Sequence, residues 1–201
     1  AFAWWVPHTL KKRDQIISAV HKCVRLPSTK YGILVPQSTR QALEFDLING
    51  DLVWQDAINK EMHNDAVAFK LKDEDERIGN DYKSVGFHMV FDIKMDFTRK
   101  ARLVANGHKV PDPAVSTYSG VVLRESILIA FTYTALNNLD IMTANIGNAH
   151  LQAPTSGKYY TKLGPEFGPD YEGHIAYIVR AAYGLKEAGA DFCNHLRDCM
   201  C

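Results

Sequence analysis

The alternation of apolar and polar residues between 87 and 96 constrains the fold of this chain more than any other feature. Every second residue is apolar, and the apolar set is Phe87, Met89, Phe91, Ile93 and Met95. A period of two is typical of a strand with one apolar face. The turn sequence DFTR follows, and KARLVA continues as a second strand. The segment 86–108 therefore predicts an antiparallel hairpin.

Helical patterns lie on both sides of this hairpin. The predicted helices span residues 9–25, 41–51, 52–62, 126–137 and 186–200. Ser38 and Thr39 precede the second helix at an N-cap position, and Gly50 supplies its stop. The third helix has an apolar face made of Trp54, Ala57, Ile58 and Met62. The fourth, SILIAFTYTALN, is so apolar that we expect it to be buried.

Short apolar runs predict further strands at 139–145, 159–161 and 174–182. Between the predicted elements, residues 26–38 are expected to be extended or loop, and residues 147–153 a short helix or turn. Strands grouped in hairpins beside separate helices are typical of a mixed fold. The sequence therefore predicts an α+β chain in which antiparallel hairpins pack with helices.

The charge balance limits the possible partners. The 201 residues include 23 basic and 23 acidic side chains, so the formal net charge is zero. A bulk attraction to nucleic acid is therefore absent, and any basic surface must be local. No apolar run reaches the roughly 18 residues of a membrane span, so we expect no membrane partner. The start, AFAWWVPHTLKKRD, is the reverse of a signal peptide and lacks an initiator Met, so we expect a piece of a longer protein.

The cysteines leave two interpretations of the C-terminus. Cys23 is far in sequence from Cys193, Cys199 and Cys201, which is not a disulfide framework and favours a reducing compartment. The pattern C-x-H-x3-C-x-C could supply zinc ligands, with His195 and Cys199 on one helix face. No second pair at finger-like spacing lies upstream. The alternative is a helix whose cysteines pack as small apolar groups, and the spacing favours it.

The predicted hairpin carries a candidate phosphate-binding face. Between residues 94 and 109 there are five basic residues and one acidic one. Lys100 and Arg102 alternate along one strand, so their side chains leave the same face. Lys acts on phosphate as a point charge and Arg as a fork, so this pair suits phosphate binding. The alternative is an ordinary solvated strand face.

A second candidate site lies where the predicted strand 139–145 ends. Asn145 is a polar side chain at the end of an apolar strand, and Gly147 follows, where a backbone can approach a ligand closely. The alternative is a simple turn after a strand.

Several ordered segments together resemble the reverse transcriptase of copia-type retrotransposon polyproteins. They are FDIKMDFTRKARLVANGH, TYSGVVLRESILIAFTYTALNNLDIMTANIGNAHLQAP, LGPEFG and VRAAYGLKEAGADFCNHL. The upstream pieces WWVPHTLKKRDQIISAV, KYGILVP and LVWQDAINKEM resemble the segment between integrase and polymerase in that family. The resemblance spans nearly the whole chain.

The resemblance implies a right hand of fingers, palm and thumb, acting on an RNA or DNA template–primer and deoxynucleoside triphosphates. The KARLV hairpin would belong to the fingers, where Lys100 and Arg102 approach the triphosphate and the template. In the family, the first palm strand ends on an Asp, which binds two Mg²⁺ ions together with a downstream Tyr-x-Asp-Asp hairpin. Asn145 takes the position of that Asp here.

The resemblance also assigns positions around the nucleotide. Ile146 follows Asn145 and counts among the nucleotide- and template-binding positions. His150 takes the place of an aromatic residue that packs under the sugar. The YGLK motif, with Gly184 and Lys186, would lie beside the nucleotide and template.

The sequence departs from the family at points that matter for chemistry. Asn145 brings no negative charge, and Mg²⁺ sites depend on carboxylates. His150 replaces the aromatic residue, Asn106 replaces a Gly, and Glu187 stands where Gln or Ser is usual. The 201 residues contain no Tyr-x-Asp-Asp. We therefore expect no metal bound by this chain, although the family uses Mg²⁺.

The sequence thus predicts a fragment of a copia-type reverse transcriptase that does not catalyse nucleotidyl transfer. Its parts would be a pre-polymerase linker at 1–51, fingers at 52–138 and a partial palm at 139–201. One alternative is a residual nucleic-acid-binding module, and another is a decayed element with no molecular function. The resemblance implies an intracellular location, in the cytoplasm or a virus-like particle.

Overall fold

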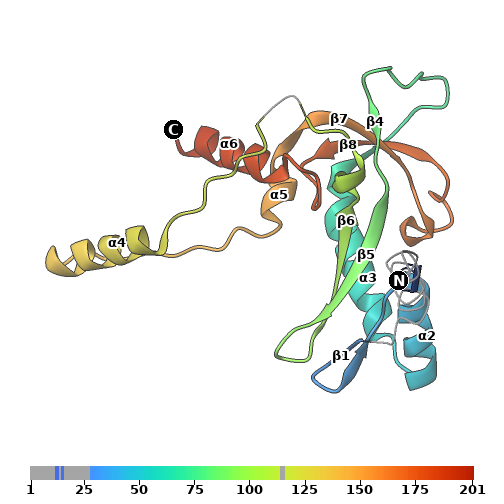
Figure 1. Ribbon diagram of the computed structural model, residues 1–201, viewed down its shortest axis with the longest axis horizontal. Helices are drawn as coiled ribbons and strands as arrows, with labels where there is room; N and C mark the ends of the chain where they lie inside the picture. Colours follow the sequence, from blue (N-terminus) through green and yellow to red (C-terminus); the bar gives the residue numbers. More distant parts are fainter. Residues whose placement is uncertain (1–11, 14, 16–27, 114–115) are drawn as a thin grey trace, which may run out of the picture.

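The computed structural model describes residues 12–13, 15, 28–113 and 116–201, so most of the predicted helix 9–25 lies outside the described residues. The chain is mixed α+β, as predicted (Figure 1). The strands are β1 (Ser28–Lys30), β2 (Ile33–Val35), β3 (Phe69–Leu71), β4 (Lys83–Ser84), β5 (Phe87–Ile93), β6 (Arg99–Ala105), β7 (Pro154–Lys162) and β8 (Ile175–Arg180). The helices are α2 (Thr39–Asn49), α3 (Val53–Asp65), α4 (Arg124–Leu136), α5 (Ala149–Gln152) and α6 (Ala188–Met200).

The hairpin predicted at 86–108 is confirmed as β5 and β6. The strands pair antiparallel, with Phe87 opposite Ala105 and Ile93 opposite Arg99. Along β5 the apolar side chains are buried or partly buried and those between them are exposed, which is the predicted alternation. The strand ends at Ile93, so Met95 lies in the turn with its side chain exposed. There the Lys94 amide donates to the Thr98 carbonyl oxygen over 3.0 Å and closes the turn, and the Thr98 amide donates to an Asp96 carboxylate oxygen within it.

Two helices cover the buried face of this hairpin, and both are confirmed at the predicted places. In α3, Trp54 packs edge-to-face on Phe91, with ring centroids 5.6 Å apart. The α2 helix has Ser38 as its N-cap and Gly50 in the left-handed conformation as its C-cap. Buried Asp46 of α2 accepts hydrogen bonds from the first turn of α3, so it fixes the angle between the two helices. The resulting core also includes Val35, Ala42, Ile58, Met89, Ile93, Ala101 and Leu103.

A second core lies under a four-stranded sheet with the order β3-β8-β7-β4. β8 pairs antiparallel with β3 and β7, whereas the short β4 pairs parallel with β7. The predicted strands 159–161 and 174–182 are thus present, the first of them longer than predicted and the second shorter. Helix α6 packs on this sheet through Ala188 and Phe192. Phe69 and Phe87 touch both cores and join them.

The sequence did not predict the small hairpin of β1 and β2 within residues 26–38. Its turn places Tyr31 at φ 53° and Gly32 at φ 76°. A bulky residue at positive φ is uncommon, so the sequence gives little sign of such a turn.

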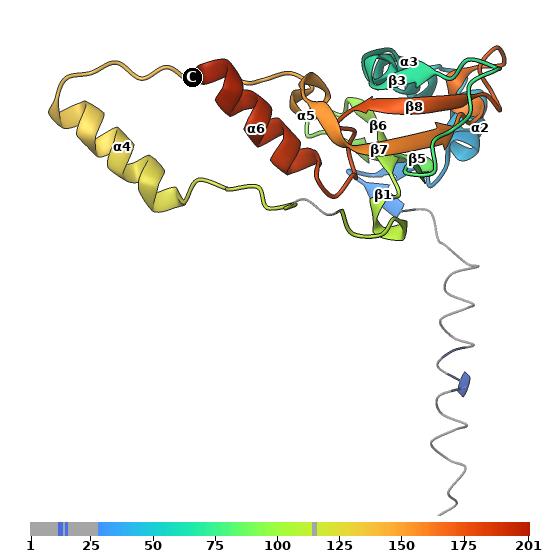
Figure 2. The same ribbon diagram turned by 90° about the horizontal axis from the view of Figure 1, so that it is seen from above.

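Residues 120–146, which we call the arm, correct two predictions. The helix predicted at 126–137 forms as α4, but the expectation that it is buried is wrong, because none of its residues is buried. The prediction of a strand at 139–145 is also wrong, because these residues pair with no strand of the described chain. Figures 1 and 2 both show α4 standing away from the two sheets, carried there by extended segments on either side. Among the described helices, α4 included, none is long and apolar enough to span a membrane.

Candidate nucleic-acid interface

The end of β6 meets the YGLK loop, which connects β8 to α6. The Ala105 amide donates to the Tyr183 carbonyl oxygen over 2.7 Å. Gly184 has φ +90°, and a Cβ at this position would overlap the backbone of Ala105. A Cβ on Gly107 would in turn overlap the carbonyl oxygen of Gly184. Two glycines therefore allow the loop and the hairpin, about 80 residues apart in sequence, to touch backbone to backbone.

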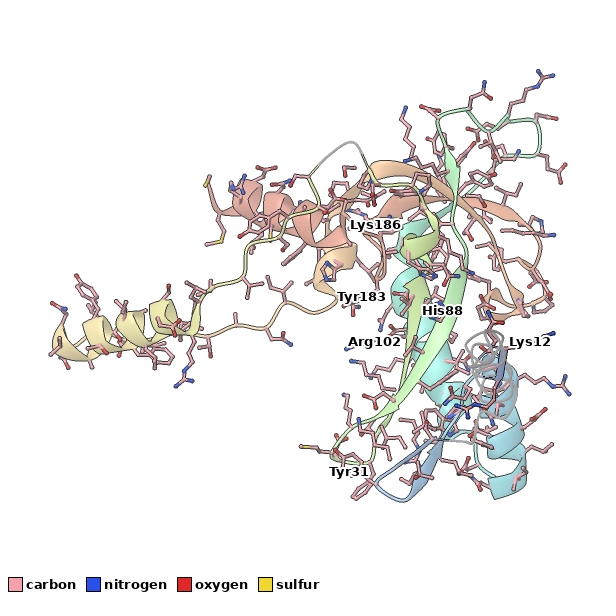
Figure 3. The ribbon with its side chains drawn as sticks, in the orientation of Figure 1. Lys12, Tyr31, His88, Arg102, Tyr183 and Lys186 are labelled. Atoms are coloured by element: carbon pink, nitrogen blue, oxygen red, sulfur yellow. The ribbon has the colours of Figure 1, made fainter. Side chains whose placement is uncertain are left out.

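This contact brings a cation and two rings together. The Arg102 guanidinium lies over the ring of Tyr183, 5.9 Å from its centroid. The His150 ring meets Tyr183 edge-on at 5.1 Å, and its Nδ1 lies 3.2 Å from the carbonyl oxygen of Ala188. Figure 3 shows Arg102 and Tyr183 on the same side of the hairpin, with Lys186 beyond them. We call Arg102, His150 and Tyr183 the central cluster.

The basic face of β6 is confirmed as a face, and it has acidic neighbours. Lys100 and Arg102 alternate with the buried Ala101 and Leu103. Glu61 of α3 approaches both cations: burial raises the pKa of its carboxyl, while Lys100 and Arg102 act in the opposite direction. This carboxylate reduces the positive electrostatic potential of the strand.

Asp65 lies one helical turn beyond Glu61 and is 4% exposed. Burial, together with the nearby Glu61, raises the pKa of Asp65 to about 7. One of its carboxylate oxygens is buried without a hydrogen-bond partner among the described residues. Below that pH Asp65 is neutral. Glu61 is then the acidic group at this end of α3, and it faces the basic strand β6.

A pocket of about 230 Å³ opens between α3 and the hairpin. Its lining is rich in basic side chains and contains one carboxylate; it comprises Ala57, Lys60, Glu61, Asn64, Lys94, Thr98, Arg99, Lys100, Ala101 and Asn148. In the described part of the chain, Lys60 and Lys94 form no salt bridge. The pocket therefore adds positive charge next to Lys100, on the side of the hairpin that faces α3.

Lys186 is held by the protein itself. Its Nζ donates to the carbonyl oxygen of Val110 over 2.8 Å and forms an ion pair with Asp112 over 2.6 Å. The hydrogen bond from Lys186 lowers the pKa of the Asp112 carboxyl. This side chain ties the YGLK loop to the segment that follows β6, and only part of its charge faces solvent.

Asn145 and Ile146 form no hydrogen bond, ion pair or ring contact with this cluster among the described residues. Both are exposed in the extended end of the arm, and Ile146 is 44% exposed. Of the residues singled out from the sequence, Arg102, His150, Gly184 and Lys186 lie where the YGLK loop meets β6, and Lys100 lies near the start of the same strand. The two arm residues do not join them.

The described residues do not fit the family's Mg²⁺ pair or a zinc site. Asn145 is exposed, and no three His, Cys, Asp or Glu side chains in the described ranges are placed to hold a metal ion. His195 and Cys199 do share a helix face, with Nε2 and Sγ 3.8 Å apart, as the i, i+4 spacing predicts. Two ligands on one exposed turn fall short of the four in a structural zinc site.

Two residues of the interface were not singled out from the sequence. Tyr183 is the first residue of the YGLK motif, so the motif could have pointed to it. Glu61 lies in an ordinary charged helix segment, and only the packing of α3 on β6 brings it to Lys100. Comparison with family models, with curated proteins and with solved structures finds no match.

Proposed function

We propose that this chain is the fingers and part of the palm of a copia-type reverse transcriptase, and that it retains a face for RNA or DNA. The fingers would comprise residues 52–138 and the partial palm residues 139–201, after a linker at 1–51. The order of the resembling motifs along the chain supports this assignment. The α+β fold and the contact between the KARLV strand and the YGLK loop agree with it.

The observation that carries the proposal is the cation–π contact between the Arg102 guanidinium and the Tyr183 ring, 5.9 Å from its centroid. Single-stranded nucleic acid is bound by basic grooves that follow the backbone and by rings on which bases stack. The central cluster offers both elements in one place: a guanidinium for phosphate, and the Tyr183 and His150 rings for a base. Lys100, two residues along the strand, extends the basic track.

The electrostatics predict a weak and salt-sensitive interaction. The chain has no net charge, and Glu61 and Asp92 both interact with the cations of β6. Because phosphate contacts supply most of the affinity, binding falls as salt rises, with a slope in proportion to the few phosphates that are neutralised.

Nucleotidyl transfer is not part of the proposed function of these 201 residues. The family's reaction needs carboxylates that hold two metal ions, and Asn145 offers only a neutral amide. A primer-extension assay with Mg²⁺ and with Mn²⁺ tests this. Template-dependent incorporation of nucleotides by the purified chain would contradict its proposed inactivity.

The binding proposal is tested by fluorescence anisotropy with labelled oligonucleotides at low and moderate salt. We expect the chain to bind at low salt, and Arg102→Ala to weaken binding. Arg197→Ala, at an exposed arginine of α6, serves as the matched control and should bind as the wild type does. Equal affinities for all three chains would reject the β6 face as the site.

A decayed element without molecular function is the second candidate, and the arm favours it. Ile129, Tyr133 and Leu136 of α4 are 69%, 62% and 81% exposed. Large exposed apolar patches promote aggregation. This candidate predicts poor folding, so a sharp cooperative melt of the purified chain would count against it.

A further inference from the structure

The tips of two hairpins touch at the end of the molecule opposite the YGLK loop. Tyr31 lies in the turn between β1 and β2, and Phe97 lies in the turn between β5 and β6. Their rings meet edge-to-face, with centroids 6.0 Å apart and planes at 78°. Tyr31 is 50% exposed and Phe97 is 56% exposed. Each ring therefore keeps about half of its surface open to solvent.

Both aromatic residues have a backbone conformation that bulky side chains rarely adopt. Tyr31 has φ 53° and Phe97 has φ 62°. Positive φ is a genuine outlier for bulky residues, and such strain gathers at functional sites. Asn or Gly would fit either position with less strain, so turn geometry alone does not explain two aromatic rings.

The tips are held in place and carry positive charge. Lys30 Nζ lies 5.6 Å from the centroid of the Tyr31 ring and forms an ion pair with Asp92 of β5 over 2.5 Å. Arg99 and Lys94 lie at the base of the Phe97 turn and line the basic pocket. Because the rings are fixed before binding, a ligand that stacks on them pays little conformational entropy.

We propose that Tyr31 and Phe97 form a second base-stacking platform for single-stranded nucleic acid. This inference rests on the function proposed above, and it extends the track from the central cluster to the tips. Figure 3 shows Tyr31 near one end of the hairpin. Arg102, Tyr183 and Lys186 follow in this order towards the other end. Phe97 precedes Arg102 by five residues, about 15 Å of extended chain. Lys94 and Lys100 supply cations in this interval for the phosphates between the two platforms, whereas Arg99 leaves the other face of β6 and lies over the Trp54 ring.

A purely structural role for the ring pair, joining the two hairpins, is the alternative to be separated by experiment. The variant Tyr31→Asn, Phe97→Asn removes both rings and suits positive φ, so the turns should be retained. Tyr31→Phe keeps a ring and should bind as the wild type does. Tyr171→Asn removes a tyrosine of equal exposure, 49%, far from the hairpin tips in sequence, and is the matched control.

Anisotropy titrations use labelled oligo(dT) and oligo(U) of about 4 and about 16 nucleotides, the range of site sizes for such proteins. For the long oligonucleotides we expect the double Asn variant to bind about tenfold more weakly, as the loss of base stacking predicts. A short oligonucleotide can occupy only one platform at a time, so its binding should change much less than that of the long ones. Comparing the two polymers shows whether the track prefers RNA or DNA.

Each outcome decides between the proposals. If the double variant binds long oligonucleotides like the wild type, or if Tyr171→Asn loses as much, the second platform is overturned. If Arg102→Ala binds both lengths normally, the proposed function fails. The affinity of the double Asn variant for the long oligonucleotides then decides alone whether the hairpin tips bind nucleic acid. A fall in melting temperature with unchanged affinity would assign the ring pair a structural role and overturn the inference.

Discussion

Gly107 and Gly184 lie so close that a methyl group on Gly107 would overlap the carbonyl oxygen of Gly184. This contact joins the end of the hairpin to the YGLK loop, and it positions Tyr183 beside Arg102. The geometry of the candidate interface therefore depends on two residues that have no side chain.

Replacing Gly184 by Ala tests this dependence. The new Cβ would meet the backbone of Ala105, and the residue would be held at φ +90°. Strain and overlap of this kind cost about 2–3 kcal/mol of unfolding free energy. Gly147→Ala is the control, since its Cβ would meet no atom within 4 Å. Chemical denaturation of both variants should separate them, and equal stabilities would contradict the contact.

Glu187 supplies a second prediction. This side chain is 1% exposed, and its buried carboxylate lies beside Tyr159. Burial, and then the hydrogen bond with the Glu187 carboxylate and its charge, raise the pKa of Tyr159. Because burying a carboxylate is costly and a Gln keeps an oxygen beside Tyr159, Glu187→Gln should stabilise the chain by about 1–3 kcal/mol at pH 7. Glu172→Gln, at an exposed position, should change little; a destabilising Gln at 187 would show that the charge of the carboxylate is needed there.

Asp65 predicts a specific pH dependence. Its pKa rises from 3.8 to about 7 on folding, mainly because of burial. Between these values the folded chain holds a proton that the unfolded chain has lost, so stability falls as pH rises through this window. Asp65→Asn removes this loss.

We therefore expect Asp65→Asn to be more stable than the wild type at pH 8, with a difference that shrinks towards pH 4. Thermal melts of both chains across this range provide the measurement. The control is Asp170→Asn, which changes an exposed carboxyl. A stability difference that stays constant with pH would mean that Asp65 does not titrate in this window.

The arm predicts an unusual tolerance to substitution. Ile129 is 69% exposed in the middle of α4, and Leu103 is 2% exposed in the core. Ile129→Lys should leave the melting temperature nearly unchanged and reduce concentration-dependent self-association, because it breaks an exposed apolar surface. Leu103→Ala should lose about 2–5 kcal/mol. Comparable losses in the two variants would show that α4 packs against something in solution.

Local patterns predicted the local structure well. The alternation from Phe87 to Ile93 predicted the hairpin, the Ser38 and Gly50 caps predicted α2, and Trp54 with Ile58 predicted the buried face of α3. In each case the deciding interactions are near in sequence, so the pattern alone contains them.

Features that depend on a distant partner were not predictable in the same way. The apolar helix at 126–137 forms, but burial needs a surface to pack against, and residues 139–145 need a neighbouring strand. The sequence identified Lys100, Arg102 and the YGLK motif separately. It could not show that the motif and the strand touch. The contact is between two backbones, so its only mark on the sequence is the pair of glycines, Gly107 and Gly184.

The most direct test of the account is a double-mutant cycle between Arg102 and Tyr183, with oligonucleotide affinity at low salt as the readout. Each single change, Arg102→Ala or Tyr183→Ala, should weaken binding about tenfold, while Tyr183→Phe keeps the ring and most of the affinity. Since the two side chains form one binding face, the double variant should lose less than the sum of the singles, with a coupling of about 0.5–3 kcal/mol. Wild-type affinity in both single variants, or strictly additive losses, would contradict a shared nucleic-acid interface.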